Sequence, residues 1–107
     1  MKAAKKVVYD NLIYSINEKE KMASVIGYKE DIKNIFIPSS IPINSEYYLV
    51  NSIADNALKF HKAETLQFSQ YAEIQYIGSN AFFEADFQTI IIPSSITNFD
   101  KYWNNGL

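Results

Sequence analysis

Short apolar runs, each bounded by a polar turn, follow one another along the first half of the chain. Residues 7–16 hold two such runs around Asp10 and Asn11, and both of these residue types tolerate a positive φ, so the pattern predicts a β-hairpin. Beyond the hairpin, alternation of apolar and polar positions predicts a series of further strands. These expected strands lie at 22–28, 34–38 and 46–53.

The second half of the chain repeats itself with a period of 24 residues. Segment 53–68 aligns with segment 77–92, so that Asn56 meets Asn80. A period of this length is typical of stacked repeat proteins. Each unit is predicted to be a strand, a short helix or turn around Asn56 or Asn80, and a second strand. The residues placed to cap the two helical turns are Asp55 and Ser79.

The phrase Ile-Pro-Ser-Ser occurs at 37–40 and again at 92–95. Because proline has no N–H to donate to a ladder, each phrase is predicted to end the second strand of a unit. The two serines are then expected to turn the corner. The middle unit has Phe68 and Ser69 where the others have isoleucine and proline, which makes it the irregular one.

These phrases resemble the BspA-type leucine-rich repeats, whose repeat reads approximately I-x-x-x-A-F and later L-x-x-I-x-I-P-x-S-V. The resemblance extends over roughly residues 8–99 and is weaker in the 53–68 unit, where Ala54 replaces the usual glycine. It implies a β-rich α/β solenoid, a short array with an N-terminal β-hairpin cap. The residues that carry the match are Ile77, Gly78, Ala81, Phe82, Phe87, Ile90, Ile92, Pro93, Ser95 and Ile96.

The length of 107 residues predicts a single domain. We expect cap strands at 1–45, about two repeats at 46–99 and a C-terminal tail at 100–107. Solenoids usually need about three or more repeats and a cap at each end, so the short array is a departure from the pattern.

Composition excludes several function classes. The net charge of −2 has the wrong sign for a nucleic-acid phosphate backbone, and the chain has no cysteine for a disulfide, a thiolate metal site or a cysteine nucleophile. No apolar run approaches the ~20 residues that span a bilayer, so no membrane insertion is expected. The start lacks a signal-peptide pattern. The expected location is the cytoplasm, or the cell surface or medium if the chain belongs to a longer family member.

Candidate chemistry is sparse. His61 is the only histidine, and its polar surroundings predict a surface position. The acidic residues fall in turns, the serine pairs lack a nucleophile motif, and the glycines are isolated. We therefore expect no enzyme activity, no metal site and no cofactor.

A row of exposed side chains is the better candidate site. Alternation along the second strand of each unit turns Phe36, Gln67 and Ile91 outward at equivalent positions. An apolar row of this kind is typical of a protein-binding surface. The alternative is that a loop or the N-terminal hairpin covers the row. Tyr102 and Trp103 either cap the last repeat or form an interface with another chain.

The leading hypothesis is a non-enzymatic protein-binding module. The resemblance implies surface adhesion and protein binding, with no shared catalytic residues. Small size and slight acidity favour an alternative, an intracellular inhibitor that blocks the active or nucleic-acid site of a partner protein. Self-association through the C-terminal end is a further hypothesis.

Overall fold

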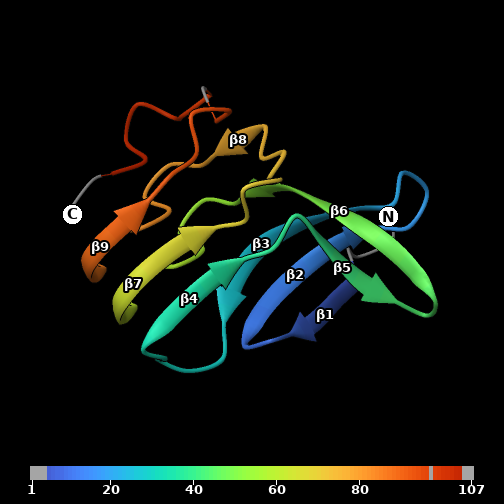
Figure 1. The fold of residues 1–107 in the computed structure, drawn as a ribbon, viewed down its shortest axis with the longest axis horizontal. Coiled ribbons are helices and arrows are strands. Elements are labelled where there is room, and N and C mark those ends of the chain that lie inside the picture. The colour runs from blue at the N-terminus through green and yellow to red at the C-terminus, as the bar shows by residue number, and fades with distance from the viewer. Residues whose placement is uncertain (1–4, 97, 105–107) are drawn as a thin grey trace.

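The computed structural model describes residues 5–96 and 98–104, which form nine strands and no helix (Figure 1). Within these residues there is accordingly no helix that could cross a membrane. The strands are β1 (Lys5–Tyr9), β2 (Leu12–Asn17), β3 (Met22–Tyr28), β4 (Asn34–Ile37), β5 (Ser40–Ile43), β6 (Glu46–Ile53), β7 (Lys62–Phe68), β8 (Tyr76–Ile77) and β9 (Asp86–Ile91).

The chain begins with an antiparallel meander of β1, β2 and β3. Asp10 and Asn11 have φ values of 48° and 71°, so the predicted hairpin turn is confirmed. The Asn11 side chain donates to the carbonyl oxygen of Glu30 at 2.8 Å and accepts from the Glu30 N–H at 3.2 Å. The turn thereby also holds the chain that leaves β3.

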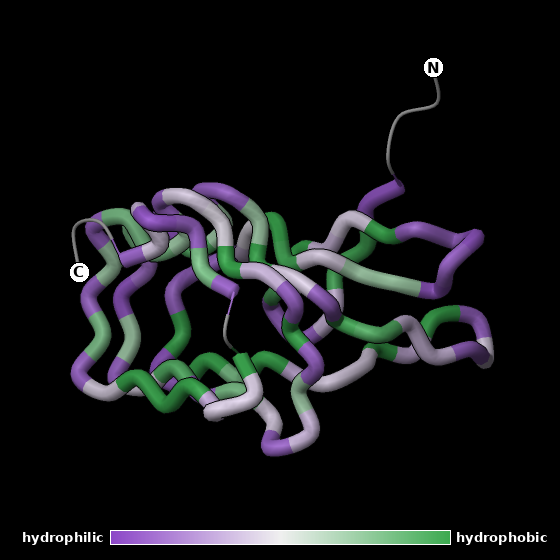
Figure 2. Tube along the Cα trace, turned by 90° about the horizontal axis from the view of Figure 1, so that it is seen from above, coloured by the Kyte–Doolittle hydropathy of each residue, from purple (hydrophilic) through white to green (hydrophobic). Residues whose placement is uncertain are grey.

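After the meander the chain coils, and successive passes pair in parallel. On one side, β6 pairs with β3 and with β8, where Ile53 lies opposite Ile77. Ile77 in turn forms a bridge to Phe99. On the other side, β4, β7 and β9 form a three-stranded sheet. Figure 2 shows the passes lying side by side near the C-terminal end.

The register of the three-stranded sheet confirms the repeat. Lys62 pairs with Asp86 and Gln67 with Ile91, which is the offset of 24 residues seen in the sequence. The core lies between this sheet and the larger sheet, and the turns contribute to it. Its largest fully buried side chains are Tyr14, Phe82, Leu12, Ile35, Ile37, Ile41, Ile53, Leu58, Leu66, Ile77, His61 and Val25.

Around Asn56 and Asn80 the chain forms turns and not helices, so the α component of the predicted fold is absent from the described residues. Asn56 has a φ of 61° and Asn80 a φ of 55°, values that interrupt a right-handed helix. Some N–H groups of the turn also donate to the next coil: the Leu58 N–H donates to the carbonyl of Ala81 at 2.7 Å. An N–H group that donates to the next coil cannot also form the hydrogen bond of a helix.

The capping prediction is corrected in the same way. Asp55 Oδ1 accepts from the N–H of Ser79 at 2.8 Å, a residue of the next coil rather than of its own turn. At this point a Cβ on Gly78 would lie 2.6 Å from Asp55 N and 2.9 Å from the Ala54 carbonyl carbon. Only glycine allows the two turns to approach so closely.

The first Ile-Pro-Ser-Ser phrase leads into a strand that the sequence did not predict. β5 pairs antiparallel with β6 through a tight turn at Asn44 and Ser45, whose φ values are 49° and 67°. Pro42 is tolerated because β5 is an edge strand. The first phrase therefore both ends one strand and begins the next, because its Ser40 is the first residue of β5.

The middle unit uses a backbone N–H at the position where the other two units have proline. The N–H of Ser69 donates to the carbonyl oxygen of Ile37 at 2.8 Å and so extends the pairing of β4 with β7. Proline at this position would remove the donor. Pro38 and Pro93 occupy the corresponding positions in the sheet's two outer passes.

Candidate protein-binding face

The outer face of the three-stranded sheet carries the predicted row. Phe36 pairs with Gln67, and Gln67 with Ile91, so the three side chains lie side by side across β4, β7 and β9. Phe36 is 47% exposed and Ile91 49% exposed, and Gln67 is also exposed. Among residues 5–96 and 98–104, neither the meander nor a loop covers them. We refer to these three residues as the apolar row.

The inward neighbours of the row fix its direction. Ile35 and Ile37 are buried on either side of Phe36, and Leu66 and Phe68 are buried on either side of Gln67. Because successive side chains of a strand point to opposite faces, the buried pairs force the residues between them outward. The row is therefore a consequence of core packing.

Polarity increases along the strands away from the apolar row. In the next register row, Thr65 Oγ1 donates to Asn34 Oδ1 at 2.7 Å. Near the start of the strands, Lys33 Nζ lies 3.8 Å from Glu64 Oε2. A shallow groove of about 410 Å³ lies here. Its lining residues are Asp31, Ile32, Lys33, Lys62, Ala63, Glu64, Asp86 and Gln88.

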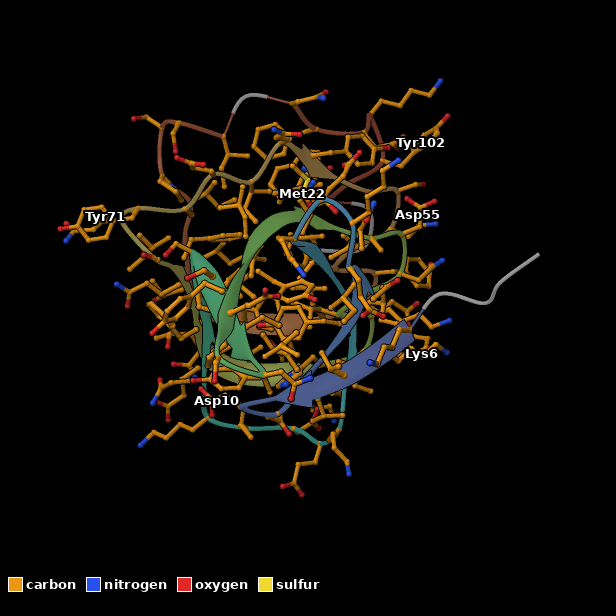
Figure 3. All side chains as sticks on the ribbon, turned by 90° about the vertical axis from the view of Figure 1, so that its right-hand side faces the viewer. Lys6, Asp10, Met22, Asp55, Tyr71 and Tyr102 are labelled. Carbon is orange, nitrogen blue, oxygen red and sulfur yellow. The ribbon has the colours of Figure 1, made fainter. Side chains whose placement is uncertain are left out.

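Tyr102 and Trp103 lie apart from the apolar row. The N–H of Asn80 donates to the carbonyl of Tyr102 at 3.0 Å, so this segment stacks on the turn before β9, whereas Ile91 ends β9. In Figure 3, Tyr102 lies on the same side of the view as Asp55, and Tyr71, from the loop after β7, lies on the other side.

The two residues also differ from each other. The Trp103 ring packs edge-on against Phe82, with centroids 6.0 Å apart, and lies 4.8 Å from Phe99. Tyr102 is 52% exposed and has Lys101 Nζ 4.8 Å from its ring centroid. Trp103 thus covers the end of the core, while Tyr102 faces solvent.

The expectation of a surface histidine is wrong. His61 is fully buried, with its ring centroid 4.4 Å from that of Tyr28. The polar stretch around it in the sequence did not reveal this, because its burial depends on residues from other coils. Tyr28 contributes from β3, and Phe87, 6.2 Å away, contributes from β9.

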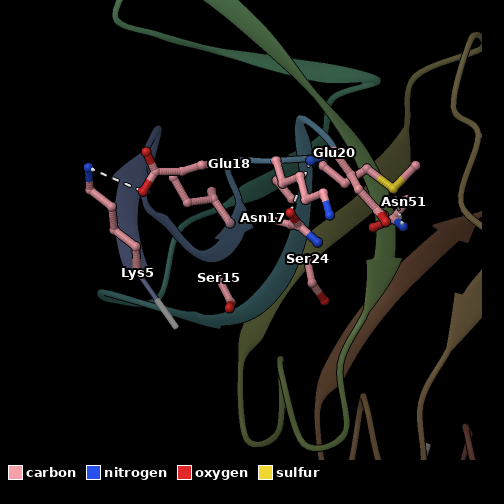
Figure 4. Close-up of a pocket in the computed structure, with 11 residues that line it drawn as sticks. Lys5, Ser15, Asn17, Glu18, Glu20, Ser24 and Asn51 are labelled. Atoms are coloured by element: carbon pink, nitrogen blue, oxygen red, sulfur yellow. Dashed lines mark hydrogen bonds and ion pairs between the residues drawn. The ribbon is translucent and has the colours of Figure 1, made fainter. Parts of the chain in front are cut away.

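A second groove, of about 730 Å³, lies on the outer face of the larger sheet and was not foreseen (Figure 4). At one end, Lys5 Nζ lies 3.8 Å from Glu18 Oε1. Ser24 lines the groove, and the Ser52 hydroxyl donates to the Ser24 hydroxyl at 2.7 Å. No histidine lines the groove, so its serines have no imidazole base beside them.

Among residues 5–96 and 98–104 there is no group of three or more histidine, cysteine or acidic side chains placed to hold a metal ion. A third groove, of about 460 Å³, is lined by Ala72, Glu73, Ile74, Gln75, Ser95 and Asn98. The features of this region that bear on function are the apolar row, the grooves and the buried His61.

The fold places the chain in a known class. It is similar to a leucine-rich repeat protein from Bacteroides capillosus, with 18% sequence identity, a TM-score of 0.65, and coverage of 95% of this chain and 94% of that one. It is also similar to a leucine rich cell surface protein from Faecalibacterium prausnitzii, with 13% identity and a TM-score of 0.53. That match covers 90% of this chain but 38% of the other.

The fold is therefore that of the leucine-rich repeat proteins, and the resemblance seen in the sequence is confirmed at the level of the fold. No protein-family model matches the sequence, and no curated protein matches it either. These likenesses concern the fold alone.

Proposed function

We propose that this chain is a non-enzymatic protein-binding module that captures a partner protein through the apolar row. The observation that carries the proposal is the exposure of Phe36 and Ile91 on either side of Gln67, in register on one sheet face. Apolar side chains gathered on an exposed face lower the free energy of association when a partner covers them.

The surroundings of the row support binding to protein. The core of a protein interface is apolar and its rim is polar. Here the threonine and asparagine of the next register row, and beyond them the Lys33–Glu64 pair, supply polar groups beside Phe36 and Ile91. Gln67 offers both a donor and an acceptor in the middle of the row.

We further propose an adhesin-like role at a cell surface. The support is the likeness in fold to a leucine rich cell surface protein, of which this chain spans 38%. Tyr102 is proposed as a second contact, at the C-terminal end, where a partner or a second copy of the chain would meet it. Trp103 contributes by holding that end in shape.

The test compares three variants of one chain. Phe36→Asp and Ile91→Asp place a charge in the row, and Val8→Asp places the same charge on β1, where Val8 is 54% exposed. Affinity purification from the native host is expected to enrich the same protein with the wild type and with Val8→Asp. We expect both row variants to lose it while keeping the wild-type circular dichroism spectrum.

Retention of the partner by folded Phe36→Asp and Ile91→Asp would show that the row is not the site. If the enriched partner is an enzyme or nucleic-acid-binding protein whose activity falls when the chain is added, the role is that of an inhibitor rather than an adhesin. Sedimentation velocity at high concentration tests self-association, and a clean monomer argues against it.

A further inference from the structure

The histidine ring is buried where three passes of the chain meet. Tyr28 reaches it from β3 and Phe87 from β9, and His61 itself directly precedes β7. Hydrogen bonds join the same passes: the N–H of Asp86 donates to the His61 carbonyl at 2.9 Å, and the Tyr28 hydroxyl donates to the Lys59 carbonyl at 2.9 Å. A change at this ring therefore acts on several coils together.

The two ring nitrogens of His61 have different surroundings. Nδ1 lies 3.1 Å from the carbonyl oxygen of Lys62 and 3.5 Å from Asp31 Oδ1. Both neighbours are acceptors, which assigns the proton of the neutral ring to Nδ1. Nε2 is buried and has no hydrogen-bond partner among the described residues. A second proton would fall on Nε2, where no acceptor receives it.

The contacts beside the ring hold the turn at 29–33 to the start of β7. Asp31 Oδ1 accepts from the N–H of Lys62 at 3.2 Å. The Lys33 carbonyl accepts from the N–H groups of Glu64 at 2.7 Å and Thr65 at 3.3 Å. These few hydrogen bonds lie directly before β4, the strand that carries Phe36.

We infer that His61 is a pH-sensitive contact: its protonation in mildly acidic conditions releases the turn at 29–33 from the start of β7. The released turn frees the beginning of β4, so the contact made by Phe36 weakens as well. This last consequence rests on the proposed function, whereas the release itself does not.

Two titratable side chains contact the ring: Tyr28 of β3, with ring centroids 4.4 Å apart, and Asp31 of the turn at 29–33. Lys59, Lys62 and Asp86 take part through their backbones. The Lys59 carbonyl accepts from the Tyr28 hydroxyl, the Lys62 carbonyl lies beside Nδ1, and the Asp86 N–H donates to the His61 carbonyl. Burial lowers the pKa of His61, and the opposing effects of the Asp31 charge and the Lys62 carbonyl are smaller.

The direction of the pH effect follows from this lowered pKa. A released ring has the ordinary pKa of about 6.5 and binds a proton more tightly than the buried ring does. The conformation with the buried ring is therefore most stable, relative to the released one, above about pH 6.5. It loses this stability as the pH falls below that value.

The test uses the single histidine of the chain and needs no partner. The ring is followed by NMR through its Cε1–H signal, and exchange of the Lys62, Glu64 and Thr65 amides is measured at about pH 7.5 and about pH 5. We expect a ring pKa below 6.5, and amide protection at least about tenfold lower at pH 5 after correction for intrinsic rates.

Two control variants keep the test decisive. His61→Phe fills the space between Tyr28 and Phe87 without titrating, and His61→Asn retains a donor for the Lys62 carbonyl. Protection at these amides should be equal at both pH values in whichever variant folds. The inference is overturned by a ring pKa of 6.5 or above, by unchanged protection in the wild type, or by the same acid loss in the variants.

Discussion

The antiparallel meander and the parallel coils bring their backbones together to different degrees. In the meander, a Cβ added to Gly27 would meet only the Ile13 side chain, with its nearest atom 3.7 Å away. In the coils, a Cβ added to Gly78 would clash with Asp55, whose backbone nitrogen would be 2.6 Å away. The meander has room for a methyl group, and the stacked turns have none.

The difference has a local cause. Gly78 donates to the Ile53 carbonyl at 2.8 Å and lies against the turn of the preceding coil. Ala54, at the equivalent place one period earlier, donates to the Val25 carbonyl of β3 at 2.8 Å. Ala54 thus lies against β3, a strand of the meander, rather than against another stacked turn. The departure from glycine at Ala54 therefore marks the boundary between the two regions.

The largest expected effect comes from Gly78→Ala. The new Cβ forces the turn of the last coil away from Asp55, and we expect a loss of about 3 kcal/mol in the free energy of unfolding. Gly27→Ala is the matched control and should change stability by less than about 1 kcal/mol. Urea unfolding of both variants measures the contrast, and equal losses would contradict it.

Trp103→Ala tests whether the stacked coils need a cap beside Phe82 and Phe99. The ring is partly buried against Phe82 and Phe99, so we expect a loss of about 2 kcal/mol, less than for a fully buried tryptophan. Tyr102→Ala should cost less than about 0.5 kcal/mol, because that ring faces solvent. Thermal unfolding compares the two, and the reverse ranking would refute the cap.

Ser69→Pro tests the pairing that holds the first two coils together. The substitution removes the N–H that donates to Ile37, and we expect a loss of about 1–2 kcal/mol. Ser69→Ala keeps this N–H and loses only the acceptor of the Tyr71 N–H, so its effect should be smaller. Denaturant midpoints separate the variants, and a neutral Ser69→Pro would mean that the ladder bond contributes little.

The smallest effect is expected within the meander. The Tyr14 hydroxyl is buried without a hydrogen-bond partner among the described residues, and burial is the main reason that its pKa is raised. Tyr14→Phe removes a polar group and keeps the ring, so stability should stay the same or rise by up to about 1 kcal/mol. Calorimetry would detect a clear loss, which would reveal a partner for the hydroxyl.

Much of the local structure could be predicted from residue types. The turn at Asp10 and Asn11 depends only on the tolerance of these residues for positive φ. The strand at 46–53 depends on its apolar pattern. The apolar row could be predicted for a related reason, because alternation along a strand and a constant offset between strands are both visible in the sequence.

The features that the sequence did not predict depend on contacts between distant parts of the chain. β5 depends on β6 as its antiparallel partner, and a proline within it argues against a strand unless the edge position is known. No helix forms at 55–60 because alternate N–H groups, those of Asn56, Leu58 and Phe60, donate to carbonyls of the next coil. Burial of His61 depends on Tyr28 and Phe87, which lie far from it in sequence.

By itself the sequence determined the period of 24 residues, the positions of most strands and the equivalence of Phe36, Gln67 and Ile91. These properties follow from short-range geometry, namely the two-residue alternation of a strand and the repetition of one motif. The tertiary structure alone decided the partners of the turn donors, the path of β5 and the environment of His61. Each of these depends on which distant backbone or ring lies beside a residue, and stacking of the coils determines that.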